Sequence, residues 1–365
     1  MEGDLIHINE WMRPLSWLYG CGVKFRNLLF EWGILKQTSY DLPVICVGNI
    51  TVGGTGKTPH TELLLRMLMP SHRVAVLSRG YKRKSRGFRL AMPTTPMREI
   101  GDEPWQMKQK FPEAIVAVDT DRRHGISQLL TLEATRDADV ILLDDAFQHR
   151  YVKASLNILL TDYHRLITDD ELLPAGRLRE PIAAKERANI VIVTKCPAEM
   201  KPMDYRVIQE ALWLKPYQNL FFSTFRYGAL RHLFGETSGQ TEELTPDTHV
   251  LLLTGIASPQ QMLMDLRRMT RHITALSFAD HHEFEAHDIQ RIEEAFTALQ
   301  GSKRFIITTE KDAARLMLVD DLSPIVRRHI YVMPIEVVFL RDEGPAFEQL
   351  VLDNISRLNH TRVEG

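Results

Sequence analysis

The stretch Thr51-Val52-Gly53-Gly54-Thr55-Gly56-Lys57-Thr58 decides the fold of this chain. An apolar run at residues 44–47 precedes it, and residues 61–68 form a helical pattern after it. A strand, a glycine-rich turn ending in Gly-Lys-Thr and a helix make a phosphate-binding loop. Glycines let several backbone N–H groups point at one anion, and the helix N-terminus adds partial positive charge. The stretch therefore predicts a bound nucleoside triphosphate.

Within this loop, Lys57 is expected to reach the β- and γ-phosphates, and the Thr58 hydroxyl to hold Mg²⁺. The usual spacing begins with a glycine, and Thr51 stands at that position. Gly53 and Gly54 supply backbone freedom instead. The alternative is an ordinary glycine turn, which the strand–helix context disfavours.

Composition narrows the class of protein. The chain has 365 residues, 44% of them hydrophobic, which is enough for two domains with sizeable cores. A formal net charge of -2 argues against bulk nucleic-acid binding. Cys21, Cys46 and Cys196 are widely spaced, which indicates a reducing compartment and no structural zinc. The sequence shows neither a long apolar spanning run nor a secretory signal pattern, and no obligate protein partner is inferred.

Residues 1–40 differ from the rest of the chain. Three of the five tryptophans, Trp11, Trp17 and Trp32, lie here among apolar and basic residues. An amphipathic helix of this kind can lie in a bilayer interface, with its cations near anionic lipid. It can equally pack on the protein's own core, and the pattern alone does not separate the two.

From residue 42 onward, apolar runs alternate with helical segments. This predicts an α/β fold of the P-loop NTPase type, with a mostly parallel sheet flanked by helices. We expect a nucleotide-binding domain at 41–228, a smaller α/β domain at 229–365, and a boundary near 228–247, which is rich in Gly, Thr, Ser and Pro. The expected strands are residues 44–47, 73–77, 114–118, 140–143, 157–160, 190–193, 249–253, 304–307 and 330–333.

Asp144 and Asp145 follow one of these strands directly. Ligands of parallel sheets bind at the carboxyl ends of the strands, and an acid there is what the second metal motif of these NTPases requires. The two neighbours point in different directions, so one can serve the Mg²⁺ shell and the other accept a hydrogen bond or proton. Helix capping is the alternative role.

Two further turns carry candidate residues. Ser78-Arg79-Gly80-Tyr81 ends a strand expected beside the phosphate loop, so Arg79 can meet a phosphate group. Gly101-Asp102-Glu103-Pro104 places paired acids where a helix begins. A kinase acting on an alcohol needs a carboxylate to orient the hydroxyl and take its proton, although Asp102 alone also suits a helix cap.

The remaining signals are weaker by themselves. Arg177 and Arg179 lie in one loop that suits an anionic group, although arginines in a loop are usually only solvated. Asp280 and His281 suit proton handling better than zinc binding, with a helix cap as the alternative. The guanine-reading Asn-Lys-x-Asp pattern is absent, because Thr194-Lys195-Cys196-Pro197 lacks the aspartate. A guanine-specific GTPase is therefore disfavoured.

Taken in order, these motifs resemble the tetraacyldisaccharide 4'-kinase family of lipid A biosynthesis over residues 14 to 312. The family's phosphate loop also lacks the first glycine. The motifs that carry the resemblance are Pro14-Leu15-Ser16-Trp17-Leu18-Tyr19-Gly20, the phosphate loop with Val47-Gly48-Asn49-Ile50 before it, Ser78-Arg79-Gly80-Tyr81, Gly101-Asp102-Glu103-Pro104, Asp144-Asp145-Ala146-Phe147-Gln148-His149, Leu173-Pro174-Ala175-Gly176, Asp280-His281 and Thr309-Glu310-Lys311-Asp312.

The resemblance implies transfer of the γ-phosphate of ATP, with Mg²⁺, to the 4'-hydroxyl of an acylated glucosamine disaccharide 1-phosphate. It implies a membrane-associated enzyme on the cytoplasmic face of a Gram-negative inner membrane. By motif, Lys57 and Thr58 resemble the phosphate and metal ligands, Asp144 and Asp145 the metal-side pair, Asp102 the base and His281 its dyad partner. Tyr81 and Glu103 resemble further active-site residues, and Arg177 a contact of the lipid phosphate. Ala146 departs from the family, where glycine is expected.

Two other functions fit parts of the sequence. A nucleotide-switch or metallochaperone-type ATPase acting on a protein partner shares the phosphate loop and the acidic strand end, but predicts neither the aromatic N-terminus nor the Asp102 and His281 motifs. A soluble small-metabolite kinase predicts no membrane partitioning.

Overall fold

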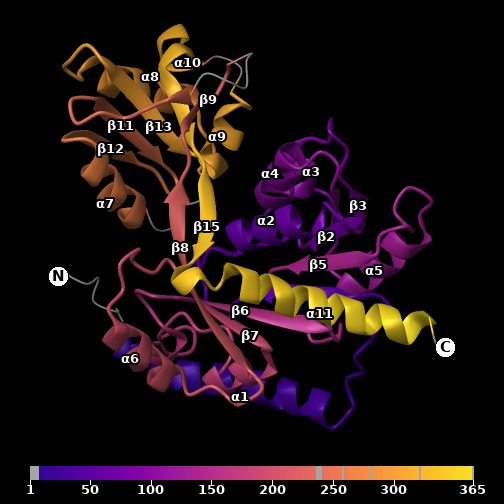
Figure 1. Ribbon diagram of the computed structural model, residues 1–365. Coiled ribbons are helices and arrows are strands. Elements are labelled where there is room, and N and C mark those ends of the chain that lie inside the picture. Colours follow the sequence, from indigo (N-terminus) through magenta and orange to yellow (C-terminus); the bar gives the residue numbers. More distant parts are fainter. Residues whose placement is uncertain (1–7, 236–240, 257–258, 280–281, 320–321, 364–365) are drawn as a thin grey trace. The chain divides into compact units, whose positions relative to one another are not determined.

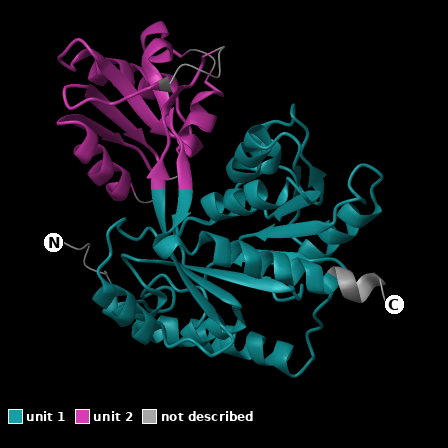
Figure 2. Cartoon of the chain, in the orientation of Figure 1, with its two compact units in different colours: residues 1–225, 337–365 teal, residues 226–336 magenta. Residues whose placement is uncertain are grey.

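The computed structural model describes residues 8–235, 241–256, 259–279, 282–319 and 322–363. The chain divides into two compact units, one formed by Met1–Phe225 with Val337–Gly365 and the other by Arg226–Glu336 (Figure 2). Each unit is a helix-covered sheet.

The sheet of the first unit has nine strands in the described residues, in the order β15-β8-β7-β6-β1-β5-β2-β4-β3 (Figure 1). All strand pairs from β8 to β4 are parallel, and β3 pairs antiparallel with β4. Parallel strands covered on both faces are apolar along their whole length, which is why these runs stand out in the sequence. The strands are β1 (Val44–Gly48), β2 (Val74–Ser78), β3 (Arg89–Leu90), β4 (Ile115–Val118), β5 (Val140–Asp144), β6 (Leu156–Asp162), β7 (Ile190–Thr194), β8 (Asn219–Tyr227) and β15 (Ile335–Phe339).

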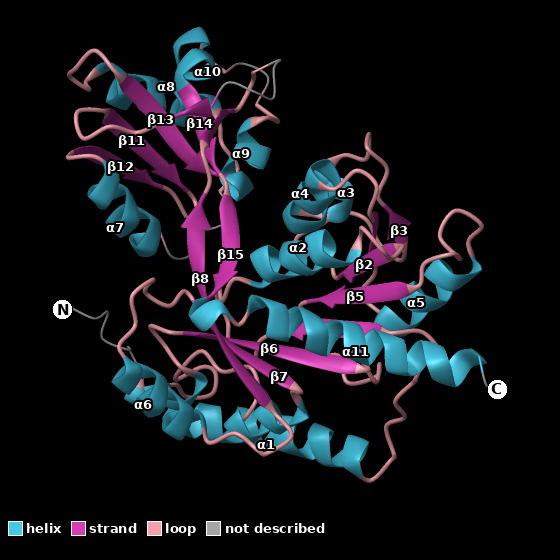
Figure 3. Ribbon diagram, viewed as in Figure 1, coloured by secondary structure: helices cyan, strands magenta, loops and turns pink. Residues whose placement is uncertain are grey.

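Helices cover both faces of this sheet (Figure 3). One apolar cluster joins the sheet to α2 (Lys57–Leu68), α3 (Met97–Ile100), α4 (Asp102–Lys110) and α11 (Gly344–Val363). The other joins it to α5 (Arg122–Thr131) and α6 (Pro202–Leu212). The two clusters fix the positions of the loops at the strand ends.

Helix α1 (Arg13–Glu31) lies on the first unit with few buried side chains. Ser16, Gly20 and Phe30 face the protein, whereas Trp17 is 73% exposed and Phe25 60%. No helix in the described ranges combines the length and apolarity needed to cross a bilayer.

The second unit contains a six-stranded sheet, again counting described residues, in the order β10-β9-β14-β13-β11-β12. The pairs β14–β13, β13–β11 and β11–β12 are parallel, and β9 pairs antiparallel with β14 and β10. The elements are β9 (Leu230–His232), β10 (Thr241–Glu242), β11 (His249–Thr254), α7 (Gln260–Met269), β12 (His272–Ser277), α8 (Ala286–Thr297), β13 (Arg304–Thr309), α9 (Glu310–Leu316), α10 (Pro324–His329) and β14 (Ile330–Met333).

The α/β fold class and all nine expected strands are confirmed. The division of the chain differs from the expectation that 229–365 forms one domain. Residues 337–365 lie in the first unit, because Phe347, Val351 and Ile355 of α11 fill its apolar cluster. The expected boundary at 228–247 includes two strands of the second unit, β9 and the edge strand β10.

Candidate active site

The phosphate loop connects β1 to α2. Gly53 and Gly56 adopt φ values of 117° and 84°, which side chains rarely tolerate. Thr51 is not among the positive-φ residues, so the loop needs no glycine there. Thr51 is instead buried and pairs with Leu178 through an isolated bridge. The unusual first residue of the motif is thus a structural anchor.

Asn49, just before the loop, has no exposed surface and fixes the loop from within. Its Nδ2 donates to the Thr51 hydroxyl at 3.2 Å and to the Thr55 hydroxyl at 2.8 Å, and its Oδ1 accepts from Arg179. Sequence reasoning gave Asn49 no role. A polar residue at the end of a buried strand, directly before the glycine turn, was the available signal.

The segment 177–179 runs beside the phosphate loop. The Val52 N–H donates to the Arg177 carbonyl at 2.8 Å, and the Arg179 N–H to the Ile50 carbonyl at 2.7 Å. The Arg177 side chain is exposed, whereas Arg179 Nη2 lies 3.0 Å from Asp145 Oδ1. Because alternate residues of an extended segment point to opposite sides, only one arginine of the Arg-x-Arg pair faces the acids. The sequence placed both arginines in one loop but singled out Arg177, whereas Arg179 is the arginine that pairs with Asp145.

Asp144 ends β5 and is almost fully buried. Its two oxygens accept from the Thr61 and Ser78 hydroxyls, each at 3.2 Å. Burial, then the charges of Glu103 and Asp145, raise the pKa of Asp144 to about 7. The carboxylate thus has two neutral donors and acidic neighbours, so a cation beside it would favour the ionised form.

Asp145 follows with a left-handed φ of 46°, which turns its carboxylate away from that of Asp144. Lys57 Nζ lies 3.8 Å from it, and Arg179 lies closer. Burial opposes ionisation, but Lys57 and Arg179 outweigh it, so the pKa of Asp145 lies below its ordinary value. The left-handed residue of this turn is Asp145, not Ala146, which explains why alanine is accepted there.

The oxygen atoms at the carboxyl ends of these parallel strands suit Mg²⁺. Thr58, Asp144 and Asp145 offer hard oxygen ligands, and Mg²⁺ commonly binds one or two carboxylates together with substrate phosphates and water. Among the described residues, no group of three or more His, Cys, Asp or Glu side chains could hold a metal ion. A metal here would therefore depend on the phosphates of the nucleotide.

Asp102 and Glu103 begin α4 at the same edge of the sheet. A Cβ at Gly80 would lie 2.7 Å from the Ile100 carbonyl, and one at Gly101 would lie 2.9 Å from the Tyr81 carbonyl. The turn after β2 and the start of α4 therefore pack backbone to backbone, which brings the two acids to the phosphate-loop edge. The influence of Glu103 on the pKa of Asp144 also places it near that carboxylate.

Of the other expected site residues, two lie on the turn after β2 and two fall outside the described residues. Arg79 and Tyr81 are exposed on the turn after β2, and Arg79 lies close enough to Arg122 to lower the pKa of that buried group, after the larger effect of burial. His281 and Asp280 lie outside the described residues. The expected Asp102–His281 dyad therefore stays a prediction.

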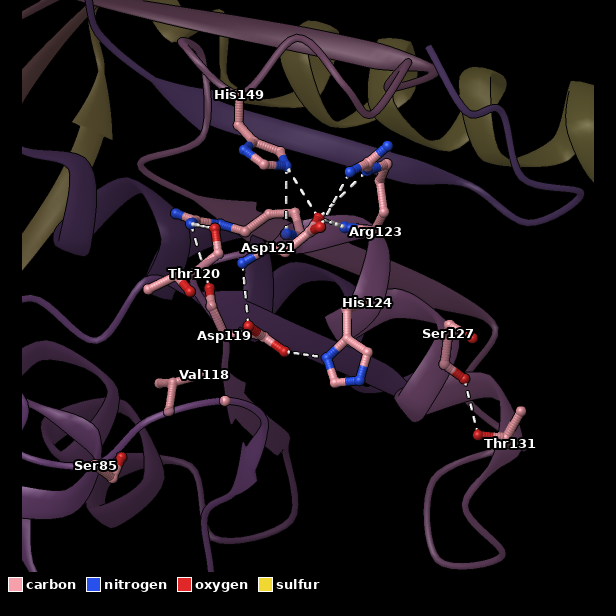
Figure 4. Close-up of polar contacts among 12 residues, drawn as sticks. Ser85, Val118, Asp119, Thr120, Asp121, Arg123, His124, Ser127, Thr131 and His149 are labelled. Atoms are coloured by element: carbon pink, nitrogen blue, oxygen red, sulfur yellow. Dashed lines mark hydrogen bonds and ion pairs between the residues drawn. The ribbon is translucent and has the colours of Figure 1, made fainter. Parts of the chain in front are cut away.

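A polar network lies at the start of α5 (Figure 4). Asp119 pairs with His124 at 2.6 Å, and His149 lies 3.7 Å from Asp121. Arg122 is buried, and its Nη2 donates to the Asp145 carbonyl at 3.4 Å. This network holds the backbone that positions Asp145.

Comparison with known proteins shows the family of this chain. The family model described as tetraacyldisaccharide-1-P 4'-kinase matches residues 8–356. Proteins named tetraacyldisaccharide 4'-kinase are 55% identical in Phocaeicola vulgatus, over 98% of both chains, and 45% identical in Porphyromonas gingivalis, over 96% of this chain and 98% of the relative. The crystal structure of LpxK from Aquifex aeolicus in complex with ATP superposes with a TM-score of 0.70 at 28% identity, covering 95% of this chain and 99% of the other. The chain belongs to the tetraacyldisaccharide-1-P 4'-kinase family.

Proposed function

We propose that this protein transfers the γ-phosphate of ATP to the 4'-hydroxyl of a tetraacylated glucosamine disaccharide 1-phosphate. The observation that carries the proposal is the meeting of Lys57, Asp144, Asp145 and the Asp102 turn at one edge of the sheet, in a chain of this kinase family. A protein-directed switch ATPase has no support from the comparisons.

In the proposed reaction the sugar hydroxyl oxygen forms a bond to the γ-phosphorus while the bond to the β–γ bridging oxygen breaks. Asp102 orients the hydroxyl and accepts its proton, with His281 as the partner that passes the proton on. Lys57 and Arg179 neutralise charge beside the transferring group. Tyr81, Glu103, Arg79 and Arg177 are proposed contacts of the acceptor side.

Mg²⁺ would be held by Thr58 with Asp144 and Asp145, and when bound it would neutralise developing phosphate charge. Asp145 already pairs with Lys57 and Arg179, whereas Asp144 accepts hydrogen bonds from the neutral Thr61 and Ser78 hydroxyls. This difference favours Asp144 as the acid that orders the metal shell and Asp145 as the acid that orders the two cationic side chains.

The proposed acceptor is a lipid, and helix α1 supports a peripheral membrane attachment. Its exposed apolar residues reach beyond the helix to Trp11, 91% exposed, and Trp32, 65% exposed. Such rings suit the depth of lipid headgroups, and the basic side chains of the helix suit anionic lipid. We propose the cytoplasmic face of a bacterial inner membrane as the location.

The segment 170–182 connects α1 with the phosphate loop. The Ala175 N–H donates to Ser16 Oγ at 2.8 Å, and the Tyr19 hydroxyl donates to the Arg179 carbonyl at 2.9 Å. A groove of about 500 Å³ lies between α1 and this segment, with Trp17, Leu172 and Ile182 among its walls. An acyl chain of the acceptor in this groove would bring the sugar toward the site.

Transfer of labelled γ-phosphate to the disaccharide 1-phosphate in detergent micelles tests the proposal. We expect a labelled lipid with the wild type and none with Asp102→Ala, which keeps its affinity for ADP. ATP consumption without labelled lipid would reject the function, and a loss of ADP affinity in the variant would reject the role of Asp102.

A further inference from the structure

Helix α1 has an inner face as well as the outer face that meets lipid in the proposed function. The outer face exposes Trp17 and Phe25. Near the C-terminal end of the helix, Arg26 and Asn27 are half-buried, and Phe30 is only 6% exposed. These three inner residues contact the chain that follows Asp145, so α1 also bears on the turn that carries this acid.

Two arginines join α1 and this turn reciprocally. Arg26 Nη2 on the helix donates to the Gln148 carbonyl at 2.9 Å, and Arg150 Nη1 after the turn donates to the Asn27 carbonyl at 3.2 Å. Both guanidinium groups lie over the Phe30 ring, at 5.5 Å and 5.0 Å from its centroid, where a cation is attracted to the aromatic face. We call these contacts of Arg26, Asn27, Phe30, Gln148 and Arg150 the α1 clasp.

The clasped turn is in turn bonded to the phosphate loop. Gln148 Nε2 donates to the Asn49 carbonyl at 2.6 Å, and the Asn49 side chain donates to the Thr51 and Thr55 hydroxyls of the loop. The turn itself begins at Asp145, whose left-handed φ sets the direction of its carboxylate. Hydrogen bonds therefore link α1 to the catalytic turn, and the catalytic turn to the loop that binds phosphate.

From these contacts we propose that Arg26 is a positioning residue of phosphate transfer, which holds the Asp145 turn in register with the phosphate loop through the α1 clasp. The inference rests on the proposed kinase function. Because Arg26 donates to a backbone carbonyl, it acts on the geometry of the turn. A displacement of about 1 Å between reacting groups can cost about a hundredfold in rate, and the clasp opposes such a displacement.

Steady-state transfer of labelled phosphate by the full-length protein in detergent micelles tests the inference by separating kcat from KM. We expect Arg26→Ala to lower kcat about tenfold and to leave KM for ATP and for lipid within about twofold. Arg26→Lys keeps a donor for the Gln148 carbonyl and should recover kcat to within about threefold of wild type. Lys36→Ala removes an exposed cation from the segment after α1 and is the matched control, which should change neither constant.

Hydrogen exchange adds a measurement that needs no lipid. Within the clasped turn the His149 N–H donates to the Ala146 carbonyl at 2.8 Å. We expect exchange of this amide to accelerate about tenfold in Arg26→Ala, because the turn opens locally without the clasp. The amides of α6, which the clasp does not contact, should keep their protection.

A wild-type kcat in Arg26→Ala would overturn the inference. A higher KM for lipid at unchanged kcat would do so too, because Arg26 would then be a substrate contact, and an equal loss of protection in α6 would make it a general structural residue. Failure of the proposed function has a different sign, since the wild type itself would form no labelled lipid. The exchange of the His149 amide would still show whether Arg26 holds the turn.

Discussion

Asp144 and Asp312 are buried aspartates at the carboxyl ends of two different parallel sheets, and their partners differ. Asp144 accepts two neutral hydroxyls and lies near Glu103 and Asp145. Asp312 accepts the Gly255 N–H at 2.9 Å, the Thr309 hydroxyl at 2.8 Å, and Arg315 Nη1 at 3.0 Å.

The difference separates a functional acid from a structural one. Burial raises the pKa of both carboxyls, so a shifted pKa by itself does not identify the catalytic residue. Their direct partners distinguish the two: Asp312 forms an ion pair with Arg315, whereas Asp144 accepts from two neutral hydroxyls beside Glu103, Asp145 and Lys57. A metal ion beside Asp144 would favour its ionised form. Four predictions test this distinction.

The largest effect is expected for Asp144→Asn. Removing the charge takes away the proposed metal-side carboxylate, and we expect phosphate transfer to the lipid to fall by about a thousandfold or more. The folded structure should persist, because asparagine Oδ1 can accept from one of the two hydroxyls while its Nδ2 donates to the other. The measurement is the initial rate of labelled phosphate transfer at saturating ATP.

Asp139→Asn is the matched control, since Asp139 lies directly before the same strand at its opposite end and pairs with His72 at 3.1 Å. It should change the rate by less than twofold. A rate near wild type in Asp144→Asn would mean that Asp144 is as structural as Asp312.

The next effect is a loss of stability in Asp312→Asn. Arg315 is only 6% exposed, and removing the Asp312 charge breaks a buried ion pair, which typically costs about 3 kcal/mol or more. Hydrogen exchange at the amides of β11 and β13 should accelerate, while those of β1 and β5 keep their protection. Unchanged protection of β11 would show that Asp312 is not what holds this sheet end.

A third prediction concerns pH. The pKa of Asp144 is raised to about 7, so the folded state holds a proton that the unfolded state releases near pH 4. This contribution to stability is complete below pH 4 and is lost as pH rises through 7. Asp144→Asn lacks this titrating group. The free energy of unfolding of the variant, relative to wild type, should therefore rise by about 1.4 kcal/mol for each pH unit between 4 and 7.

Thermal or urea unfolding of the nucleotide-free protein from pH 4 to 8 measures this gain. The same series on Asp139→Asn should show no such trend. A constant difference between Asp144→Asn and wild type at all pH values would mean that Asp144 is already ionised in the folded state.

Much of the fold followed from the sequence, because strands buried on both faces are nearly uniform apolar runs. Two strands that the sequence did not predict lack this pattern. All residues of β12 are exposed or half-buried, and β8 begins and ends with exposed or half-buried residues. The return of α11 to the first unit was also hidden, since long-range packing by Phe347 and Val351 leaves no local signature.

The site was predictable where a residue stands next to a motif and not where partners come from distant segments. Asp144, Lys57 and the Asp102 turn are recognisable from their positions after strands or before helices. The choice of Arg179 over Arg177 is not, because it depends on contacts with Asn49 and Asp145 across 130 and 34 residues of chain. Thr51 replaces the first glycine of the usual motif, but its φ is not positive, so the position does not need a glycine.

A third buried acid, Glu62 of α2, extends the comparison between functional and structural carboxylates. It is 2% exposed and contacts α4 through Lys110 Nζ at 2.6 Å and Gln106 Nε2 at 2.9 Å. Helix α4 begins with Asp102, and α2 begins with Lys57. Glu62 therefore connects the helix of the proposed base to the helix of the phosphate loop.

The smallest predicted effect is that of Glu62→Gln. Glutamine keeps the bond to Gln106 but loses the charge of the Lys110 pair, so α4 can shift along α2 without unfolding. We expect kcat for lipid phosphorylation to fall about fivefold, or ~1 kcal/mol, while ADP affinity stays within twofold. Glu133→Gln, on an exposed loop, is the matched control. Equal losses of kcat and ADP affinity would mean that Glu62 holds the whole unit together, as Asp312 does in the second sheet, rather than setting the distance between base and phosphate.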